Sequence, residues 1–97
     1  MEETLFLKCI IDENRRAIVR QLESGEMAVG DIAEGLGMEQ SLCSHHLAKL
    51  RNCGLVVAEQ RGKSVFYRLS DARIVHLMGQ LEEVSSCIGE CGCDRDG

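Results

Sequence analysis

Three cysteines near the carboxyl terminus are the residues with the clearest capacity for chemistry. Cys87, Cys91 and Cys93 form the pattern C-x3-C-x-C within seven residues. Positions 87 and 91 are one helical turn apart, and Gly89 and Gly92 allow the chain to fold Cys93 back toward them. Three thiolates can form a compact sulfur site that selects soft ions. As(III) fits this site best, Cd(II), Pb(II) and Hg(II) are close competitors, and Cu(I) and zinc also use sulfur ligands.

The other three cysteines have different expected roles. Cys9 and Cys43 are expected to pack in the core, because a buried cysteine behaves as a small hydrophobic residue. Cys53 stands at the end of an expected helix, and both packing and metal ligation remain open for it. The acidic amino terminus and the lack of a long apolar run favour a cytoplasmic chain without a membrane segment. In that compartment six cysteines favour metal or redox chemistry over structural disulfides.

A second candidate site lies in residues 40–53, QSLCSHHLAKLRNC. On a 3.6-residue period, Cys43, Leu47 and Leu50 share one apolar face. Residues 29–37 before it form a short helical pattern closed by glycines, so the two segments predict a helix-turn-helix. The alternative interpretation of residues 40–53 is an ordinary amphipathic helix. Short polar and basic side chains, which can donate to phosphates and base edges, line the other face: Ser41, Ser44, His45, Ala48 and Arg51.

Two short strands are predicted after this helix. Residues 55–60 and 64–69 are rich in β-branched or aromatic side chains and flank Arg61, Gly62 and Lys63. The pattern predicts a hairpin with a basic glycine turn. A hairpin that follows a DNA-reading helix is a wing, and Arg61 and Lys63 at its tip could meet phosphate or the minor groove. Taken alone, the same tip would be an ordinary solvated turn.

The charge of the chain is unevenly distributed. The net charge is −5, but residues 41–68 contain five basic residues and one acidic residue, a net charge of +4, and the remainder carries −9. A basic segment on an acidic body suits a protein that binds a polyanion through one surface. No nucleophile–base pair or acid/base pair occurs at motif spacing, so an enzyme is not expected.

The remaining segments predict helices around these sites. Residues 4–11 and 15–22 have helical apolar spacing, separated by a capping break at Asp12. Asp71 can cap a last helix that runs to about residue 87, and its apolar stripe could pair with a second subunit. We expect one domain over residues 1–87 and a cysteine-rich tail over residues 88–97.

At this point the sequence resembles the ArsR/SmtB family of winged-helix repressors. The resemblance covers residues 4–87. It implies a mainly α (α+β) winged helix-turn-helix with the element order α-α-α-α-β-β-α, dimerised through its first and last helices on double-stranded operator DNA. The matching segments are Leu5-Phe6, Asp12-Glu-Asn-Arg15, Asp31-Ile-Ala-Glu34, Ser41-Leu-Cys-Ser-His-His-Leu-Ala-Lys-Leu50, Gly54-Leu-Val56, Arg61-Gly-Lys63 and Tyr67-Arg68-Leu69.

The resemblance also implies which residues contact DNA. The positions carried over are Gln40, Ser41, Ser44, His45, Arg61 and Lys63. The neighbouring His46 could pack against the protein instead.

The family's known sensor sites match this chain only in part. The arsenic-sensing branch often has a CxC motif in the first helix of the helix-turn-helix, and residues 27–33 contain no cysteine. The zinc-sensing branch needs four ligands on the last helix, of which only Asp71 is present. The cadmium- and lead-sensing branch uses two cysteines at the end of the recognition helix, and this chain has Lys49 in place of the first and Cys53 at the second.

The expected function is therefore a repressor that releases its operator when a thiophilic metal or metalloid ion binds Cys87, Cys91 and Cys93, with Cys53 as a further candidate ligand. As(III) is the favoured inducer. One alternative is a repressor switched by oxidation, through a disulfide or persulfide at Cys53 or Cys87. An alternative of another class is a cytosolic metal-buffering protein built on a winged-helix scaffold.

Overall fold

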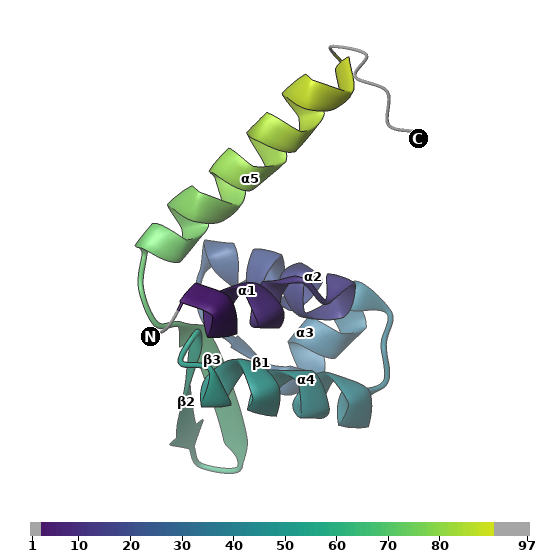
Figure 1. Cartoon of the computed structure of the whole chain (residues 1–97). Helices are drawn as coiled ribbons and strands as arrows, with labels where there is room; N and C mark the ends of the chain where they lie inside the picture. The colour runs from purple at the N-terminus through teal and green to yellow at the C-terminus, as the bar shows by residue number, and fades with distance from the viewer. Residues whose placement is uncertain (1–2, 91–97) are drawn as a thin grey trace.

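The computed structural model describes residues 3–90, and the side chains of residues 3–85. Four helices and a small sheet form the body, and a fifth helix projects from it (Figure 1). This is the expected mainly α arrangement. The elements in order are α1 (Glu3–Ile10), α2 (Glu13–Gln21), the short 3-10 helix η1 (Leu22–Ser24), β1 (Met27–Ala28), α3 (Val29–Leu36), α4 (Gln40–Asn52), β2 (Val56–Arg61), β3 (Ser64–Leu69) and α5 (Arg73–Glu90).

The junction between α1 and α2 is held by side chains of α2. Asp12 accepts a hydrogen bond from the backbone N–H of Arg15 at 3.1 Å, and this bond is the main reason that the pKa of Asp12 is lowered. The predicted cap is confirmed, although α2 begins at Glu13 rather than at residue 15. Arg16 donates to the carbonyls of Ile10 and Ile11 at 2.8 and 3.0 Å, which satisfies the carboxyl end of α1.

Each of the two helices of the helix-turn-helix is followed by a glycine with positive φ. Gly37, at φ +66°, follows α3 and turns the chain toward α4. Gly54, at φ +82°, follows α4, where the N–H of Leu55 bonds the carbonyl of Leu50 at 3.0 Å. This six-residue closure is a Schellman motif, which requires a residue that tolerates the left-handed region. The predicted stop at Gly54 is confirmed.

The sheet has three strands rather than the two predicted. β2 and β3 form the predicted antiparallel hairpin, with Arg61 opposite Ser64 at its tip. β1 adds to the other edge of β3, so that Met27 pairs with Tyr67 and Ala28 with Phe66. A strand of two residues is too short to show alternation in the sequence, and this explains why the pattern did not predict it.

The core is aliphatic, and it joins α2, α3 and α4. The inward stripe of α4 is fully buried, with Cys43, Leu47 and Leu50 each at 0% exposure. The buried residues that complete it include Ile18, Val19, Leu22, Ile32, Ala33, Leu55 and Val56. Burial of this face of α4 leaves its other face directed to solvent.

Helix α5 projects away from the body, and the described part of the molecule is elongated, with extents of 51 × 29 × 21 Å (Figure 1). Within residues 73–85, only Ile74 and Met78 are buried. The helix continues to Glu90, three residues past the expected end. No helix within residues 3–90 has the length and apolarity needed to span a bilayer.

Met78 should therefore anchor α5 to the body. We expect Met78→Ala to lower the free energy of unfolding by about 2–5 kcal/mol, since it removes a fully buried side chain and leaves a cavity. Urea denaturation followed by circular dichroism measures the change. Gln80→Ala, an exposed position on the same helix, is the matched control and should change the stability by less than about 0.5 kcal/mol. Equal effects of the two substitutions would contradict this role.

Candidate nucleic-acid interface and thiol sites

The outward face of α4 carries the polar side chains that the sequence predicted for DNA contact. Gln40, Ser41, Ser44 and His45 are all exposed. Because the opposite stripe of the same helix is buried, these side chains project together from one surface. The β2–β3 hairpin lies beside α4 in the body, with its tip extending past the helix (Figure 1). A helix and a hairpin tip in this arrangement can contact neighbouring grooves of one duplex.

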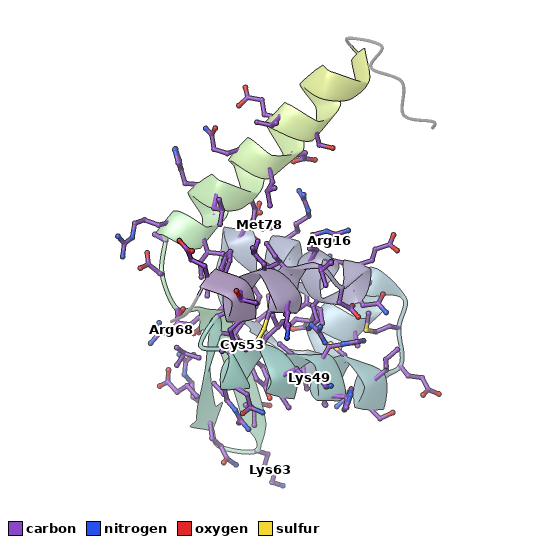
Figure 2. The ribbon with its side chains drawn as sticks, viewed as in Figure 1. Arg16, Lys49, Cys53, Lys63, Arg68 and Met78 are labelled. Atoms are coloured by element: carbon purple, nitrogen blue, oxygen red, sulfur yellow. A yellow bond between two sulfur atoms is a disulfide. The ribbon has the colours of Figure 1, made fainter. Side chains whose placement is uncertain are left out.

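Three further basic side chains are exposed on α4 and the hairpin. Lys49 and Arg51 are exposed on the last turn of α4, and Arg68 is exposed on β3. Figure 2 shows Lys49 on α4 and Lys63 at the tip of the hairpin, pointing away from the body. We call α4 and the hairpin, with these side chains, the basic face. It contains the positive segment identified in the sequence.

The two basic residues of the wing differ in their surroundings. The guanidinium of Arg61 donates to Glu26 at 2.8 Å and to Glu59 at 3.0 Å, and it lies 5.0 Å from the centre of the Phe66 ring. The hydrogen bond to Glu26 is the main cause that raises the pKa of Arg61 above its ordinary value. Lys63 is exposed and takes part in none of the ion pairs among the described residues. Lys63 is therefore the wing cation whose charge has no carboxylate beside it.

The sequence did not predict the Glu26 contact, since Glu26 precedes Arg61 by 35 residues. It arises because β1 brings the end of the α2–β1 connection alongside the hairpin. The signal was absent from local spacing and depends on strand pairing that no short pattern shows.

His46 lies on the inward side of α4, with only 7% of its surface exposed. Its two ring nitrogens have no hydrogen-bond partner among the described residues. The ring packs against the protein, which was one of the two roles expected for this residue. His45 and His46 thus face opposite environments although they are adjacent.

Cys9 and Cys53 form a disulfide (Figure 2). A disulfide at Cys53 was among the expected alternatives, but Cys9 was not predicted as its partner. The two Cα atoms are 6.9 Å apart, and 44 positions separate the residues in the chain. Cys9 is 4% exposed, so its predicted packing is confirmed, but its pairing with Cys53 was missed. Cys43 is buried as a free thiol, as expected, and burial raises the pKa of that thiol.

The cysteines of the expected metal site lie largely outside the described part of the chain. Cys87 belongs to the last turns of α5, but its side chain is outside the described residues, as are Cys91 and Cys93. Among the described residues, no three His, Cys, Asp or Glu side chains lie close enough together to hold a metal ion. Cys53 could serve as a ligand only after its bond to Cys9 is reduced.

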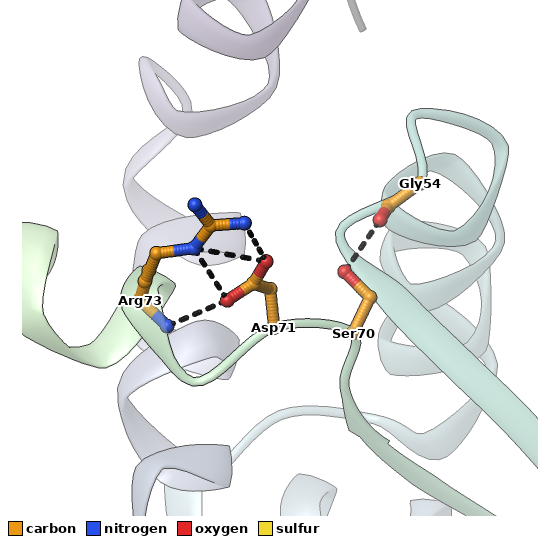
Figure 3. A network of polar contacts seen from close by, with 4 residues as sticks. All are labelled: Gly54, Ser70, Asp71 and Arg73. Atoms are coloured by element: carbon orange, nitrogen blue, oxygen red, sulfur yellow. Dashed lines mark hydrogen bonds and ion pairs between the residues drawn. The ribbon is translucent and has the colours of Figure 1, made fainter.

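Asp71 is held at the start of α5 by Arg73 (Figure 3). It accepts the backbone N–H of Arg73 at 2.8 Å and the guanidinium at 2.7 Å. These contacts lower the pKa of Asp71 to about 2, the guanidinium hydrogen bond being the largest cause. Next to it, the Ser70 hydroxyl donates to the carbonyl of Gly54 at 2.7 Å, which ties the end of α4 to the segment before α5.

A helix-turn-helix that packs on the core, exposes a polar face of its second helix and has a basic hairpin beside it defines the winged helix-turn-helix class of regulatory proteins. Residues 12–57 match the model of the bacterial regulatory proteins of the arsR family. The chain belongs to this family, which consists of transcriptional regulators rather than enzymes.

Three known proteins show the extent of the similarity. The HTH-type transcriptional regulator NmtR of Mycobacterium tuberculosis is 42% identical over 74 residues, which cover 76% of this chain and 62% of NmtR. HlyU of Vibrio cholerae is 32% identical, with a TM-score of 0.76 over 87% of this chain and 97% of that structure. A homodimeric winged helix-turn-helix DNA-binding domain from Mycobacterium bovis is 26% identical, with a TM-score of 0.80 over 97% and 85%. The chain spans 62–65% of the length of the first curated relatives it matches.

The Asp71 contacts lead to a prediction about pH. Because the pKa of Asp71 is lower in the folded protein than its ordinary value of 3.8, the ionised carboxylate stabilises the fold at pH values above 3.8. This contribution is lost as the pH falls through about 2. We expect the Asp71 carboxyl to titrate near pH 2 in an NMR titration, and Arg73→Ala to return its midpoint toward 3.8. Arg73→Lys should give a value between the two. A midpoint that does not change in Arg73→Ala would show that another group lowers the pKa.

Proposed function

We propose that this chain is a homodimeric transcriptional repressor that binds double-stranded operator DNA through the basic face. The observation that carries the proposal is the exposed polar surface of α4 beside a hairpin tipped by Lys63, on an otherwise acidic protein. Membership of a family of bacterial regulatory proteins supports it. A DNA-binding regulator works where the chromosome is, and we propose the cytoplasm as its compartment.

In this proposal α4 reads the major groove and the wing contacts the backbone. Gln40, Ser41, Ser44 and His45 can hydrogen-bond base edges or phosphates, since each is exposed and carries a donor. Lys63 supplies a phosphate contact at the hairpin tip. Arg61 can contribute fully only by exchanging its carboxylate partners for phosphate oxygens.

The second copy would cover the apolar faces of α1 and α5. Leu7 on α1 and Ile11, the residue just after α1, are 59% and 75% exposed, and Leu81 and Val84 on α5 are 41% and 53% exposed. A groove of about 740 Å³, lined by residues of α1, α2 and α5 and by Ile11, lies between these faces. Apolar surface of this kind marks a protein contact, and the related Mycobacterium bovis domain is a homodimer. A symmetric dimer presents two recognition helices to half-sites about 34–36 Å apart.

The wing residues give a test of this DNA contact. Lys63→Ala should reduce the slope of log K against log salt concentration by about 1, because one phosphate contact and its released counterion are lost. Arg61→Ala should reduce it less, since Glu26 and Glu59 already neutralise that guanidinium. Fluorescence anisotropy with a duplex selected from random DNA measures both slopes. Lys8→Ala, on α1, is the matched control and should leave the slope unchanged; a loss equal to that of Lys63→Ala would contradict the assignment.

We further propose that the inducer is a thiophilic ion, with As(III) favoured and Cd(II), Pb(II) or Hg(II) as competitors. Cys87, Cys91 and Cys93 would hold it, and Cys53 could join them when reduced. The chemistry of the donor set supports this: three thiolates within seven residues select soft ions. Ligation requires deprotonated thiols, so the affinity for the inducer should rise with pH.

The position of α5 suggests how ligation would reach the DNA-binding surface. The same helix carries Cys87 near its end, the exposed side chains Leu81 and Val84, and the anchor Met78. A change in how the end of α5 packs in the dimer would alter the separation of the two recognition helices. Coupling of about 1–3 kcal/mol per ligand weakens DNA binding roughly 5–150-fold.

Replacement of the tail thiols tests this inducer site. Cys87, Cys91 and Cys93 changed together to Ser should leave operator affinity unchanged and abolish release by As(III), because the thiolates that hold the ion are gone. Gel shifts of both proteins against As(III), Cd(II), Pb(II), Hg(II), Zn(II) and peroxide, under reducing conditions for the metals, identify the effective agent. Cys43→Ala, which removes a buried free thiol without adding a polar group, is the control and should keep the response. Release that persists in the triple variant would rule out the tail site.

A metal-buffering protein on the same scaffold is the second candidate. It would bind the same ions but show no saturable, salt-dependent binding to any selected duplex. The exposed polar face of α4 favours the repressor, because metal buffering does not require a surface of hydrogen-bond donors beside a basic hairpin.

A further inference from the structure

The Cys9–Cys53 pair joins two helices with different proposed tasks. Cys9 is in the last turn of α1, a helix whose exposed side chains we assign to the dimer contact. Cys53 is the residue that ends α4, the proposed recognition helix. The bond therefore connects the part of the chain that would set dimer geometry with the part that would read DNA.

The positions of both cysteines are set by contacts that do not need the bond. Arg15 donates from Nε to the carbonyl of Cys9 at 2.9 Å, and Arg16 holds the next carbonyl of α1. On the other side, the N–H of Cys53 bonds the carbonyl of Lys49 at 3.1 Å, and the Schellman closure at Gly54 follows. The two thiols thus remain neighbours when reduced, which is what a reversible dithiol requires.

A permanent structural role for this disulfide fits poorly with a chromosomal regulator. Thiols in a reducing compartment are kept reduced unless an oxidant acts on them. Cys43 is a free, fully buried thiol in the same domain. Cys53 is half-buried and Cys9 only 4% exposed, so an oxidant in solution reaches Cys53 first.

We propose that Cys9 and Cys53 are a redox-active pair, and that their disulfide ties α1 to α4 and weakens operator binding. This inference rests on the proposed DNA-binding function but not on the proposed ion. The oxidant class is a hydroperoxide.

Oxidation of the pair takes place in two steps. The Cys53 thiolate attacks the hydroperoxide, the O–O bond breaks, and the departing oxygen takes a proton to leave as water or an alcohol. The Cys9 thiolate then attacks the sulfur of the resulting Cys53 sulfenic acid, an S–S bond forms, the S–O bond breaks, and the departing hydroxide takes a proton and leaves as water. Two thiols lose two electrons and two protons to the hydroperoxide. Exchange with a small dithiol restores both thiols.

The weakening of DNA binding follows from lost freedom between the two helices. A recognition helix must adjust as it enters the groove, while α1 would be held by the second subunit. A covalent link between the end of α1 and the end of α4 removes that adjustment in both subunits. The reduced dimer should therefore bind its operator more tightly than the oxidised dimer.

The first measurement is the linkage itself. Hydrogen peroxide added to the full-length reduced protein should give a Cys9–Cys53 cross-linked peptide in mass spectrometry, and dithiothreitol should remove it. Cys43→Ala should still form the link, and Cys53→Ala should not. The linked form should melt about 10 °C or more above the reduced form, because the bond closes a long loop. Failure to form the link in the wild type would overturn the proposal.

The second measurement compares operator affinity in the two states, with a duplex selected by the reduced protein. This comparison uses the variant with Ser at positions 87, 91 and 93, so that the tail thiols cannot react with the oxidant. Oxidation should lower the affinity at least about fivefold and dithiothreitol should restore it, with no change in Cys9→Ala or Cys53→Ala. An unchanged or higher affinity of the linked form would overturn the coupling. Absence of any selected duplex would defeat the proposed repressor, while the linkage and melting results would still decide the redox pair.

Discussion

Burial of one stripe of α4 is the constraint on which the rest of the structure depends. Cys43, Leu47 and Leu50 are fully enclosed by α2, α3 and the start of β2. A helix buried along one side must present its other side, and here that side carries only polar, basic or small residues apart from Leu42. The stability of the body and the composition of the proposed DNA surface are thus two consequences of one helical period.

The end of α4 is the point where several contacts meet. The left-handed Gly54 closes the helix, the Ser70 hydroxyl bonds the Gly54 carbonyl, and the Cys53 sulfur joins Cys9 (Figures 2 and 3). The segment that leads to α5 and the end of α1 therefore both bear on the same turn. An effect on either helix has a short physical path to the recognition helix.

Helix α5 contrasts with this body because little of it is enclosed. Ile74 and Met78 anchor it, Arg20 pairs with Glu82 at 3.0 Å, and the apolar residues beyond them are exposed. An exposed surface ion pair contributes little on its own. A second copy is the occupant that the proposed function assigns to this face, which would make the orientation of α5 a property of the dimer.

The sequence by itself determined the order of the five helices and the hairpin, the inward stripe of α4 and the caps at Asp12 and Gly54, because each depends on local periodicity or on a residue's own conformational preference. It did not show strand β1. Only the tertiary structure decided which distant residues meet. Strand β1 brings Glu26 to Arg61, and the packing of α1 on the end of α4 brings Cys9 to Cys53. Contacts across 35 and 44 positions leave no mark in local spacing, since they depend on how whole elements pack and not on the order of neighbouring residues.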